Sequence, residues 1–230
     1  MRNLLLFAFS FLVTVSSAFA QWNQVDTKGK KQGPWKKFHE DGKTLRYEGQ
    51  FKNDIPIGVF RYYFENGKLY SENTYRGETG ICMSIQYANN GKKIAEGLYR
   101  NNLRDSVWTF YNASGNIISR ETYDKGVLHG ERTTYFSNGK IIERVVFVNG
   151  EMHGPYEQFY ENGQIQRRGA YVNDKLHGDV TIYTYNGKKL ATGKYHEGQK
   201  NGAWITFNED GRPQKREEYH YGRLEKEHTY

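Results

Sequence analysis

The sequence has 230 residues, one cysteine, a formal net charge of +7 and a mean hydropathy of −0.89. A single cysteine excludes an internal disulfide framework. Acidic residues interrupt the basic excess, which argues against the continuous basic stripe that nucleic acids require, so we predict a mixed-charge surface and no nucleic-acid partner. Aromatic residues form 16% of the chain and include 19 Tyr, so amphipathic rings rather than aliphatic side chains should supply the buried surface.

The first 20 residues differ from the rest of the chain. An apolar run, Leu4–Val15, follows Arg2 and precedes Ala18 and Ala20, which fit a small-residue cleavage site. The alternative, a membrane anchor, needs about 20 apolar residues, and this run is shorter. We therefore expect residues 1–20 to be a signal peptide that is cleaved after Ala20, and the mature chain to be periplasmic, attached to the cell surface or secreted.

After a short lead-in over residues 21–30, one glycine recurs almost periodically through residues 31–230. The first interval is 25 residues and the others are 24. The residue before each glycine is Asn, Asp or Ser, and Asn-Gly and Asp-Gly are strong hairpin signals because a type I′ turn needs φ > 0 at both central residues. We therefore expect about eight repeats, each a β-hairpin with a two-residue type I′ turn. The turn glycines are Gly42, Gly67, Gly91, Gly115, Gly139, Gly163, Gly187 and Gly211.

Aromatic residues keep a fixed distance from these glycines. The residue four before each glycine is aromatic, and a two-residue turn would place it opposite the residue three after, as in Tyr135 and Ile142. Such aromatic–aliphatic pairs stabilise antiparallel strands, and the apolar spacing of a helix is missing. The predicted fold class is all-β: an elongated, single-layer, antiparallel array of β-hairpins.

A second motif recurs where one hairpin joins the next, and three copies read Leu-His-Gly or Met-His-Gly, ending at Gly130, Gly154 and Gly178. Asp105 is expected to replace this glycine at the fourth junction. Between Gly154 and Gly178 the sequence resembles the MORN repeat in its bacterial variant, and the resemblance covers about residues 31–226. It is carried there by Gly154, Tyr156, Phe159, Asn162, Gly163, Ile165, Gly169, Tyr171, His177 and Gly178. The resemblance specifies a family and implies no particular activity.

Candidate metal ligands and nucleophiles are few. His129, His153 and His177 recur at the 24-residue period, but equivalent residues of successive hairpins lie about 9–10 Å apart, whereas zinc needs ligand atoms about 2.0–2.1 Å from the ion. We expect these histidines to pack or hydrogen-bond at the junctions, with no metal. Cys82 is expected to be a structural strand residue, and an intermolecular disulfide is the alternative.

Catalytic signatures are missing from the sequence. It contains no P-loop, no nucleophile elbow, no zinc-protease helix motif and no dinucleotide-binding fingerprint. The repeats also leave no space for a separate catalytic domain. We predict that the protein is not an enzyme and has no cofactor.

Three functions remain open from the sequence. The first is an exported, non-enzymatic scaffold or protein-binding module of the bacterial envelope or exterior, because repeat arrays bind partners on extended faces. The second, implied by the resemblance, is an antitoxin- or immunity-like component of a toxin–antitoxin pair. The third is binding to a glycan or, as the resemblance implies, to an anionic membrane surface. The glycan alternative rests on rings seven residues before turn glycines, whose other role would be packing: Trp35, Trp108, Tyr156 and Trp204.

Overall fold

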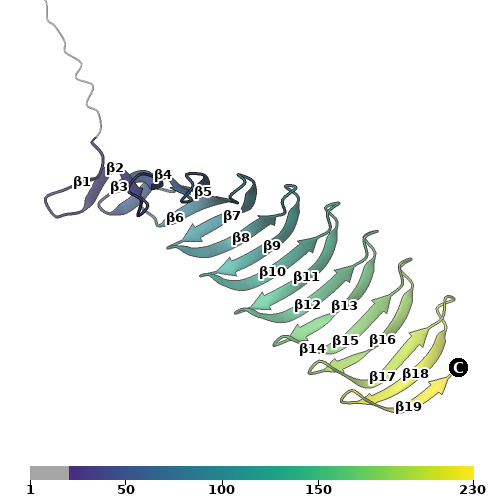
Figure 1. The fold of residues 1–230 in the computed structure, drawn as a ribbon. Helices are drawn as coiled ribbons and strands as arrows, with labels where there is room; N and C mark the ends of the chain where they lie inside the picture. The colour runs from purple at the N-terminus through teal and green to yellow at the C-terminus, as the bar shows by residue number, and fades with distance from the viewer. Residues whose placement is uncertain (1–20) are drawn as a thin grey trace, which may run out of the picture.

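The computed structural model describes residues 21–230, so the predicted signal peptide lies outside the described residues. These residues form an open, one-layer ribbon in which each strand pairs antiparallel with its neighbours in sequence (Figure 1). The predicted all-β hairpin array is therefore confirmed. Within the described part, no helix is long and apolar enough to cross a membrane.

The ribbon contains 19 strands. Within residues 21–230, the two-residue strands are β1, which pairs with β2, and β14. His177 separates β14 from β15, and both of these strands pair with β13. The strands are β1 (Gln24–Val25), β2 (Lys31–Phe38), β3 (Leu45–Lys52), β4 (Ile55–Tyr63), β5 (Leu69–Tyr75), β6 (Ile81–Tyr87), β7 (Lys93–Arg100), β8 (Leu103–Tyr111), β9 (Ile117–Asp124), β10 (Val127–Tyr135), β11 (Ile141–Val148), β12 (Glu151–Phe159), β13 (Ile165–Val172), β14 (Lys175–Leu176), β15 (Gly178–Tyr183), β16 (Lys189–His196), β17 (Gln199–Phe207), β18 (Pro213–His220) and β19 (Arg223–Thr229).

The turn glycines all have positive φ, as the sequence predicts, but the predicted turn type is wrong. At Gly139 the backbone amide donates to Phe136 (2.9 Å), and the Phe136 amide donates to Lys140 (2.8 Å). Asn138 does not share the positive φ. This is the geometry of a type I turn followed by a glycine bulge, with a three-residue loop rather than the two-residue type I′ loop.

Type I′ turns are present at the opposite edge of the ribbon. Asn149 and Gly150 both have positive φ (52° and 90°), and so do Asn173 and Asp174 (49° and 64°). Asn and Asp tolerate this left-handed conformation better than other non-glycine residues. The ribbon therefore has a bulged-turn edge, which carries the periodic glycines, and a tight-turn edge, which joins successive hairpins.

The bulged turns also change the predicted pairing at the strand ends. Tyr135 lies opposite Ile141 rather than Ile142, while Thr134 lies opposite Glu143. The predicted register thus holds inside this hairpin and is wrong by one residue beside its turn. The same one-residue shift beside the turn occurs in the hairpins of β4 with β5, β6 with β7 and β8 with β9. The first hairpin differs, because Phe38 faces Leu45 as expected.

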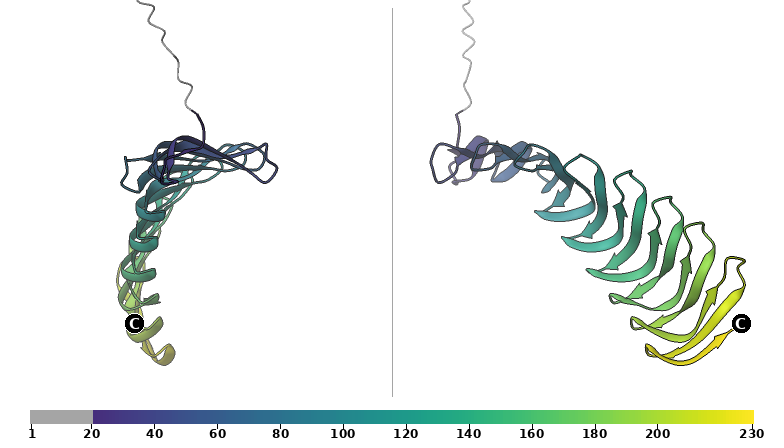
Figure 2. Two further views of the ribbon diagram at one scale, coloured as in Figure 1. Left: turned by 90° about the vertical axis from the view of Figure 1, so that its left-hand side faces the viewer. Right: turned by 45° about the vertical axis from the view of Figure 1, so that its right-hand side comes forward.

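The ribbon twists strongly along its length. Figure 2 shows the N-terminal hairpins lying crosswise to the hairpins from β8 onward. The change of direction lies near the pairing of β5 with β6. This pairing runs from Ser71 to Tyr75 without a register shift, whereas the pairing of β3 with β4 and that of β7 with β8 each contain one. The connecting loop there begins with Arg76, whose amide donates to Ile81 (2.9 Å).

The largest rings of the core lie on glycines of the preceding hairpin. A Cβ at Gly97 would lie 2.4 Å from the Trp108 ring, and one at Gly193 would lie 2.3 Å from the Trp204 ring. Gly97 itself is bulged, because the pairing shifts between Glu96 and Leu98. The Trp108 indole also donates to the Leu98 carbonyl (2.9 Å). Each such ring therefore fixes one hairpin onto the one before it.

Candidate functional site

The rings that the sequence offered as a glycan surface are mostly unavailable to a partner. Trp108, Trp204 and Tyr156 are only 0%, 4% and 5% exposed, and Trp35 is half-buried. The first three rings therefore have the packing role that was the other interpretation of their position, because each ring fills space within the sheet itself. We call the side of the sheet that holds these rings the aromatic face.

The other side of the sheet, which we call the polar face, carries one unbroken row of directly opposed residues. Thr109, for example, follows Trp108 and therefore points to the opposite side of the strand, where it lies opposite Arg120. We name the whole series the cross-sheet row. In sheet order it is Lys36, Glu48, Arg61, Glu72, Ile85, Glu96, Thr109, Arg120, Thr133, Arg144, Glu157, Arg168, Thr181, Thr192, Ile205, Arg216 and His228.

The charge of the cross-sheet row reverses along the ribbon. Every second strand from β3 to β7 contributes a glutamate, whereas every second strand from β9 to β13 contributes an arginine. These residues are equivalent in successive hairpins, so neighbours of the same sign lie about 9–10 Å apart. The three arginines, Arg120, Arg144 and Arg168, are exposed. Lys36 and Arg61 lie beside these glutamates, and Arg61 pairs with Glu72 (2.8 Å). The row is therefore only weakly negative in its first half and is positive from Arg120 to Arg168.

In the negative half, tyrosine hydroxyls hold two of the glutamates. Tyr63 donates to Glu48 (2.8 Å), and Tyr111 donates to Glu96. Burial, together with the bond to Glu48, raises the pKa of Tyr63 to about 12. The hydroxyl of Tyr111, with the nearby Lys93 ammonium, lowers the pKa of Glu96, so this carboxylate is charged at neutral pH.

In the positive half, rings at the equivalent position support the arginines instead. The guanidinium carbons of Arg120, Arg144 and Arg168 lie 5.8, 5.6 and 5.6 Å from ring centroids. Those distances are typical of cation–π contacts. Because a ring face needs no hydroxyl, Phe serves at one of these positions as well as Tyr. The rings are Tyr135, Phe159 and Tyr183.

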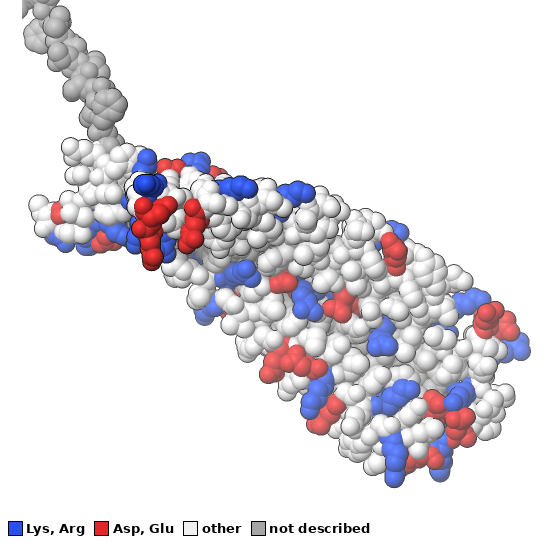
Figure 3. All heavy atoms as spheres, in the orientation of Figure 1, with Lys and Arg blue, Asp and Glu red and all other residues white. Residues whose placement is uncertain are grey.

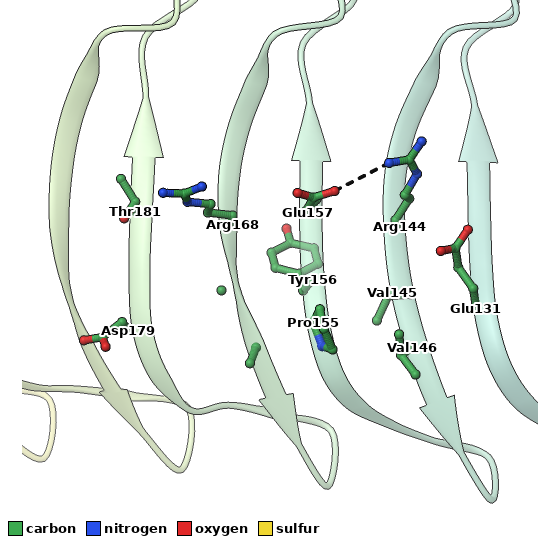
Figure 4. A pocket seen from close by; sticks show the side chains of 12 residues that line it. Glu131, Arg144, Val145, Val146, Pro155, Tyr156, Glu157, Arg168, Asp179 and Thr181 are labelled. Carbon is green, nitrogen blue, oxygen red and sulfur yellow. Dashed lines mark ion pairs between the residues drawn. The ribbon is translucent and has the colours of Figure 1, made fainter.

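A groove of about 550 Å³ lies over this positive half, on strands β10 to β15. Arg144, Glu157, Arg168 and Thr181 lie side by side across it (Figure 4), and an ion pair of 3.7 Å joins Arg144 to Glu157. Its floor includes the apolar side chains of Val146, Pro155 and Ala170. Charged and apolar atoms are therefore both accessible in one open groove.

Sequence reasoning missed this row. Its periodic arginines are visible in the sequence, but the sequence predicts only a solvated surface of mixed charge. Figure 3 shows such interspersed signs on the face in view. The signal that would have identified the row is the position of each charge within the 24-residue repeat, combined with the pairing of neighbouring hairpins.

The histidines and the cysteine do not form a second site. The rings of His177 and His196 lie 5.1 Å apart between centroids, tilted by 50° to each other. Within residues 21–230, no group of three or more His, Cys, Asp or Glu side chains is placed to hold a metal ion. Cys82 is 3% exposed, and burial raises the pKa of its thiol, so the alternative of an intermolecular disulfide requires the strand to open.

The repeats can now be compared with known families. A sequence model described as the MORN repeat variant matches residues 31–53, 56–76, 104–125, 128–149 and 152–173. The chain belongs to this MORN repeat family. MORN repeats indicate a repeat scaffold or binding module, and the family is generally non-enzymatic; the absence of enzymatic activity in this chain stays a prediction. The array of this MORN-repeat protein continues beyond the matched segments to β19.

No curated protein matches the MORN-repeat chain. Among solved structures, it is similar to Staphylococcus aureus TarM in a complex with fondaparinux (17% identity, 42% of this chain and 19% of that one, TM-score 0.33). It is also similar to a TcdB2-TccC3 fusion (12% identity, 80% and 12%, TM-score 0.24) and to a porin-like protein of Bacteroides uniformis (10% identity, 84% and 92%, TM-score 0.21). The chain thus spans about a fifth of the first of these structures. At such scores the similarities carry no argument about function.

Proposed function

We propose that the mature chain is an exported, non-enzymatic scaffold that binds a protein partner lengthwise along the cross-sheet row. The observation that supports this proposal is the row itself, which is continuous across neighbouring strands and reverses its charge along the ribbon. The opposite face is occupied by the protein's own rings. An extended open surface of this kind suits a long partner rather than a small molecule.

Position-specific crosslinking tests the binding proposal. A photoreactive residue is placed at Thr109 or Thr181 in the row, and, as a matched control, at Gln158 or Thr206 on the aromatic face. In the native host, we expect a protein adduct from the row positions and little from the controls. Adducts from the aromatic face alone, or capture of a polysaccharide and no protein, would contradict the proposal.

Export is supported by the composition of residues 1–20, and it has a separate test. The apolar run is too short to span a membrane and precedes a small-residue cleavage site. We expect mass spectrometry of protein from the native host to find Gln21 as the first residue. A chain that retains Met1–Ala20 would contradict export with cleavage, without affecting the binding proposal.

A further inference from the structure

We infer that the partner presents an extended acidic segment with a carboxylate at every third residue, and that Arg120, Arg144 and Arg168 bind it. This inference rests on the proposed function, because it assigns a chemistry to the partner of the same row. The three arginines belong to β9, β11 and β13 and occupy equivalent positions. Two strand spacings separate each from the next, which is about 9.6 Å.

The arginines are available for a new ion pair. Arg144 has one carboxylate partner, Glu157, at 3.7 Å. Within residues 21–230, no carboxylate lies within ion-pair distance of Arg120 or Arg168. Of the other acidic residues nearby, Glu143 pairs with Arg132 (3.3 Å) and Asp179 with Lys194 (3.8 Å). Glu131 accepts from the uncharged hydroxyl of Thr133 (2.7 Å), and both Glu131 and Asp179 line the groove. A bound carboxylate must therefore lie on the guanidinium groups and away from these two.

The arginines are also held in place before any partner binds. Each guanidinium lies over an aromatic ring at 5.6–5.8 Å, which limits the rotamers that it samples. Less side-chain entropy is then lost on binding. A guanidinium also forms two parallel hydrogen bonds with one carboxylate, so it suits a carboxylate better than an ammonium group does.

The spacing selects the conformation of the bound segment. A polyproline II segment has three residues per turn and rises about 3.1 Å per residue, so every third side chain recurs after about 9.3 Å. Side chains on one side of a β-strand recur after about 6.7 Å, and helix positions seven apart recur after about 10.5 Å. Over two intervals the polyproline II segment departs from the arginine spacing by about 0.6 Å and the helix by about 1.8 Å.

The surroundings limit where such a segment can lie. Val146, Pro155 and Ala170 line the groove beside the arginines and offer contact surface for the uncharged residues between the carboxylates. Toward the N-terminus, the row carries Glu48 and Glu96, which repel an acidic segment, whereas Glu72 is already paired with Arg61 (2.8 Å). The segment is therefore confined to the half of the row from β9 to β13.

The test uses synthetic peptides and the mature chain. The probe has Glu at every third position with Pro between, and the control peptide has the same composition with its Glu residues in one block. We expect the spaced peptide to bind about tenfold more tightly than the block peptide, and its binding to weaken with added salt. Equal affinity for the two peptides, or no binding of either, would overturn the spacing argument.

Matched variants locate the contact. We expect the triple variant Arg120→Gln, Arg144→Gln, Arg168→Gln to lose about tenfold or more in affinity for the spaced peptide. The control variant Lys43→Gln, Lys68→Gln, Lys140→Gln removes the same charge from exposed residues at the bulged-turn edge and should retain the affinity. Circular dichroism verifies that both variants fold. Equal losses in the two variants would show a charge effect without a site.

Three further outcomes test this inference and the proposed function separately. If a row crosslink to a protein persists in the triple arginine variant, the row binds a partner but the acidic-segment inference is wrong. If heparin binds as tightly as the spaced peptide and depends on the same arginines, the site recognises polyanions in general and the peptide chemistry is contradicted. A spaced peptide that binds without any row crosslink in the host would contradict the proposed function alone.

Discussion

At the residue scale, backbone conformation explains a departure from the repeat pattern. The position nine residues before the turn glycine is left-handed in seven of the eight repeats, and six of these residues are glycine. The seventh is Ser106, with φ of 60°. The sequence placed the missing glycine at Asp105, which is wrong by one residue. A serine in this conformation costs about 1–2 kcal/mol relative to a glycine.

We predict that Ser106→Gly raises the free energy of unfolding by about 0.5–1 kcal/mol. Relief of the left-handed strain exceeds the stability lost because glycine is more flexible in the unfolded chain, about 0.4–1 kcal/mol. Urea unfolding followed by circular dichroism measures the change. Ser114→Gly is the control, because Ser114 does not have a positive φ, and it should gain no stability. If both variants change equally, local strain is not the cause.

A second residue-scale prediction concerns the hydroxyl that lowers the pKa of Glu96. In Tyr111→Phe this hydrogen bond is lost, so the pKa of Glu96 should rise toward its ordinary value of about 4.3. A carboxylate with a lowered pKa stabilises the fold above its unfolded-state pKa, and this contribution is lost as the pH falls through the folded-state pKa. The wild type should therefore exceed the variant in stability at neutral pH, and the difference should close in acid.

Nuclear magnetic resonance titration of the Glu96 carboxyl measures this shift directly. Tyr87→Phe is the matched control, since Tyr87 occupies the same position in the preceding hairpin. It should leave the pKa of Glu96 unchanged. A Glu96 pKa that stays low in Tyr111→Phe would mean that Lys93 alone sets it.

At the scale of one hairpin, the contact of a large ring with a glycine joins that hairpin to the preceding one. The residue below the two buried tryptophans is glycine, as at Gly97 below Trp108. In contrast, Asn73 lies opposite the small Ser84, and Val145 lies opposite the smaller ring of Tyr156. Ser84 and Trp108 occupy the same position in successive repeats. The sheet therefore balances volume between adjacent strands, which a single-layer ribbon needs because it has no second layer to fill gaps.

We predict that Gly97→Ala lowers the free energy of unfolding by about 1–3 kcal/mol, the usual cost of overpacking. The added Cβ would lie 2.4 Å from the Trp108 ring, and that ring is fixed by its hydrogen bond to Leu98. Asn73→Ala, at the equivalent position, is the control and should cost less. Urea unfolding of the two variants makes the comparison, and a greater cost at Asn73 would contradict this account of the core.

The presence and position of the hairpins could be predicted from the sequence, whereas the turn type and the strand register beside the turns could not. Both candidate turns place the glycine after Asn, Asp or Ser, and they differ in the φ of that preceding residue, such as Asn138, and in whether the residue before it joins the loop. Composition determines neither. The bulges then shift pairing by one residue beside each turn. The cross-sheet row depends on that pairing across many strands, so the arginines could be seen in the sequence without being seen as neighbours.

At the scale of the whole molecule, the ribbon has two open ends and changes direction near β5 and β6 (Figure 2). The sequence shows an irregular junction there, from Gly77 to Gly80, but not the resulting twist. Each hairpin contacts only its neighbours, so stability is expected to be a sum of local terms and interface terms. The position of a defect within the array should then matter as much as its chemistry.

Gly139 and Gly211 allow that expectation to be tested with nearly identical local surroundings. Their φ angles are 81° and 79°, and a Cβ at either position would meet no atom within 4 Å. We predict that valine costs about 1–3 kcal/mol of local strain at each site. Gly139→Val should cost clearly more in total, because whole hairpins lie on both sides of its hairpin, whereas the hairpin of Gly211 is followed by the single strand β19. Thermal and urea unfolding of both variants measure the difference, and hydrogen exchange shows which hairpins open. Equal losses would mean that the ribbon unfolds as one cooperative unit in which position has no effect.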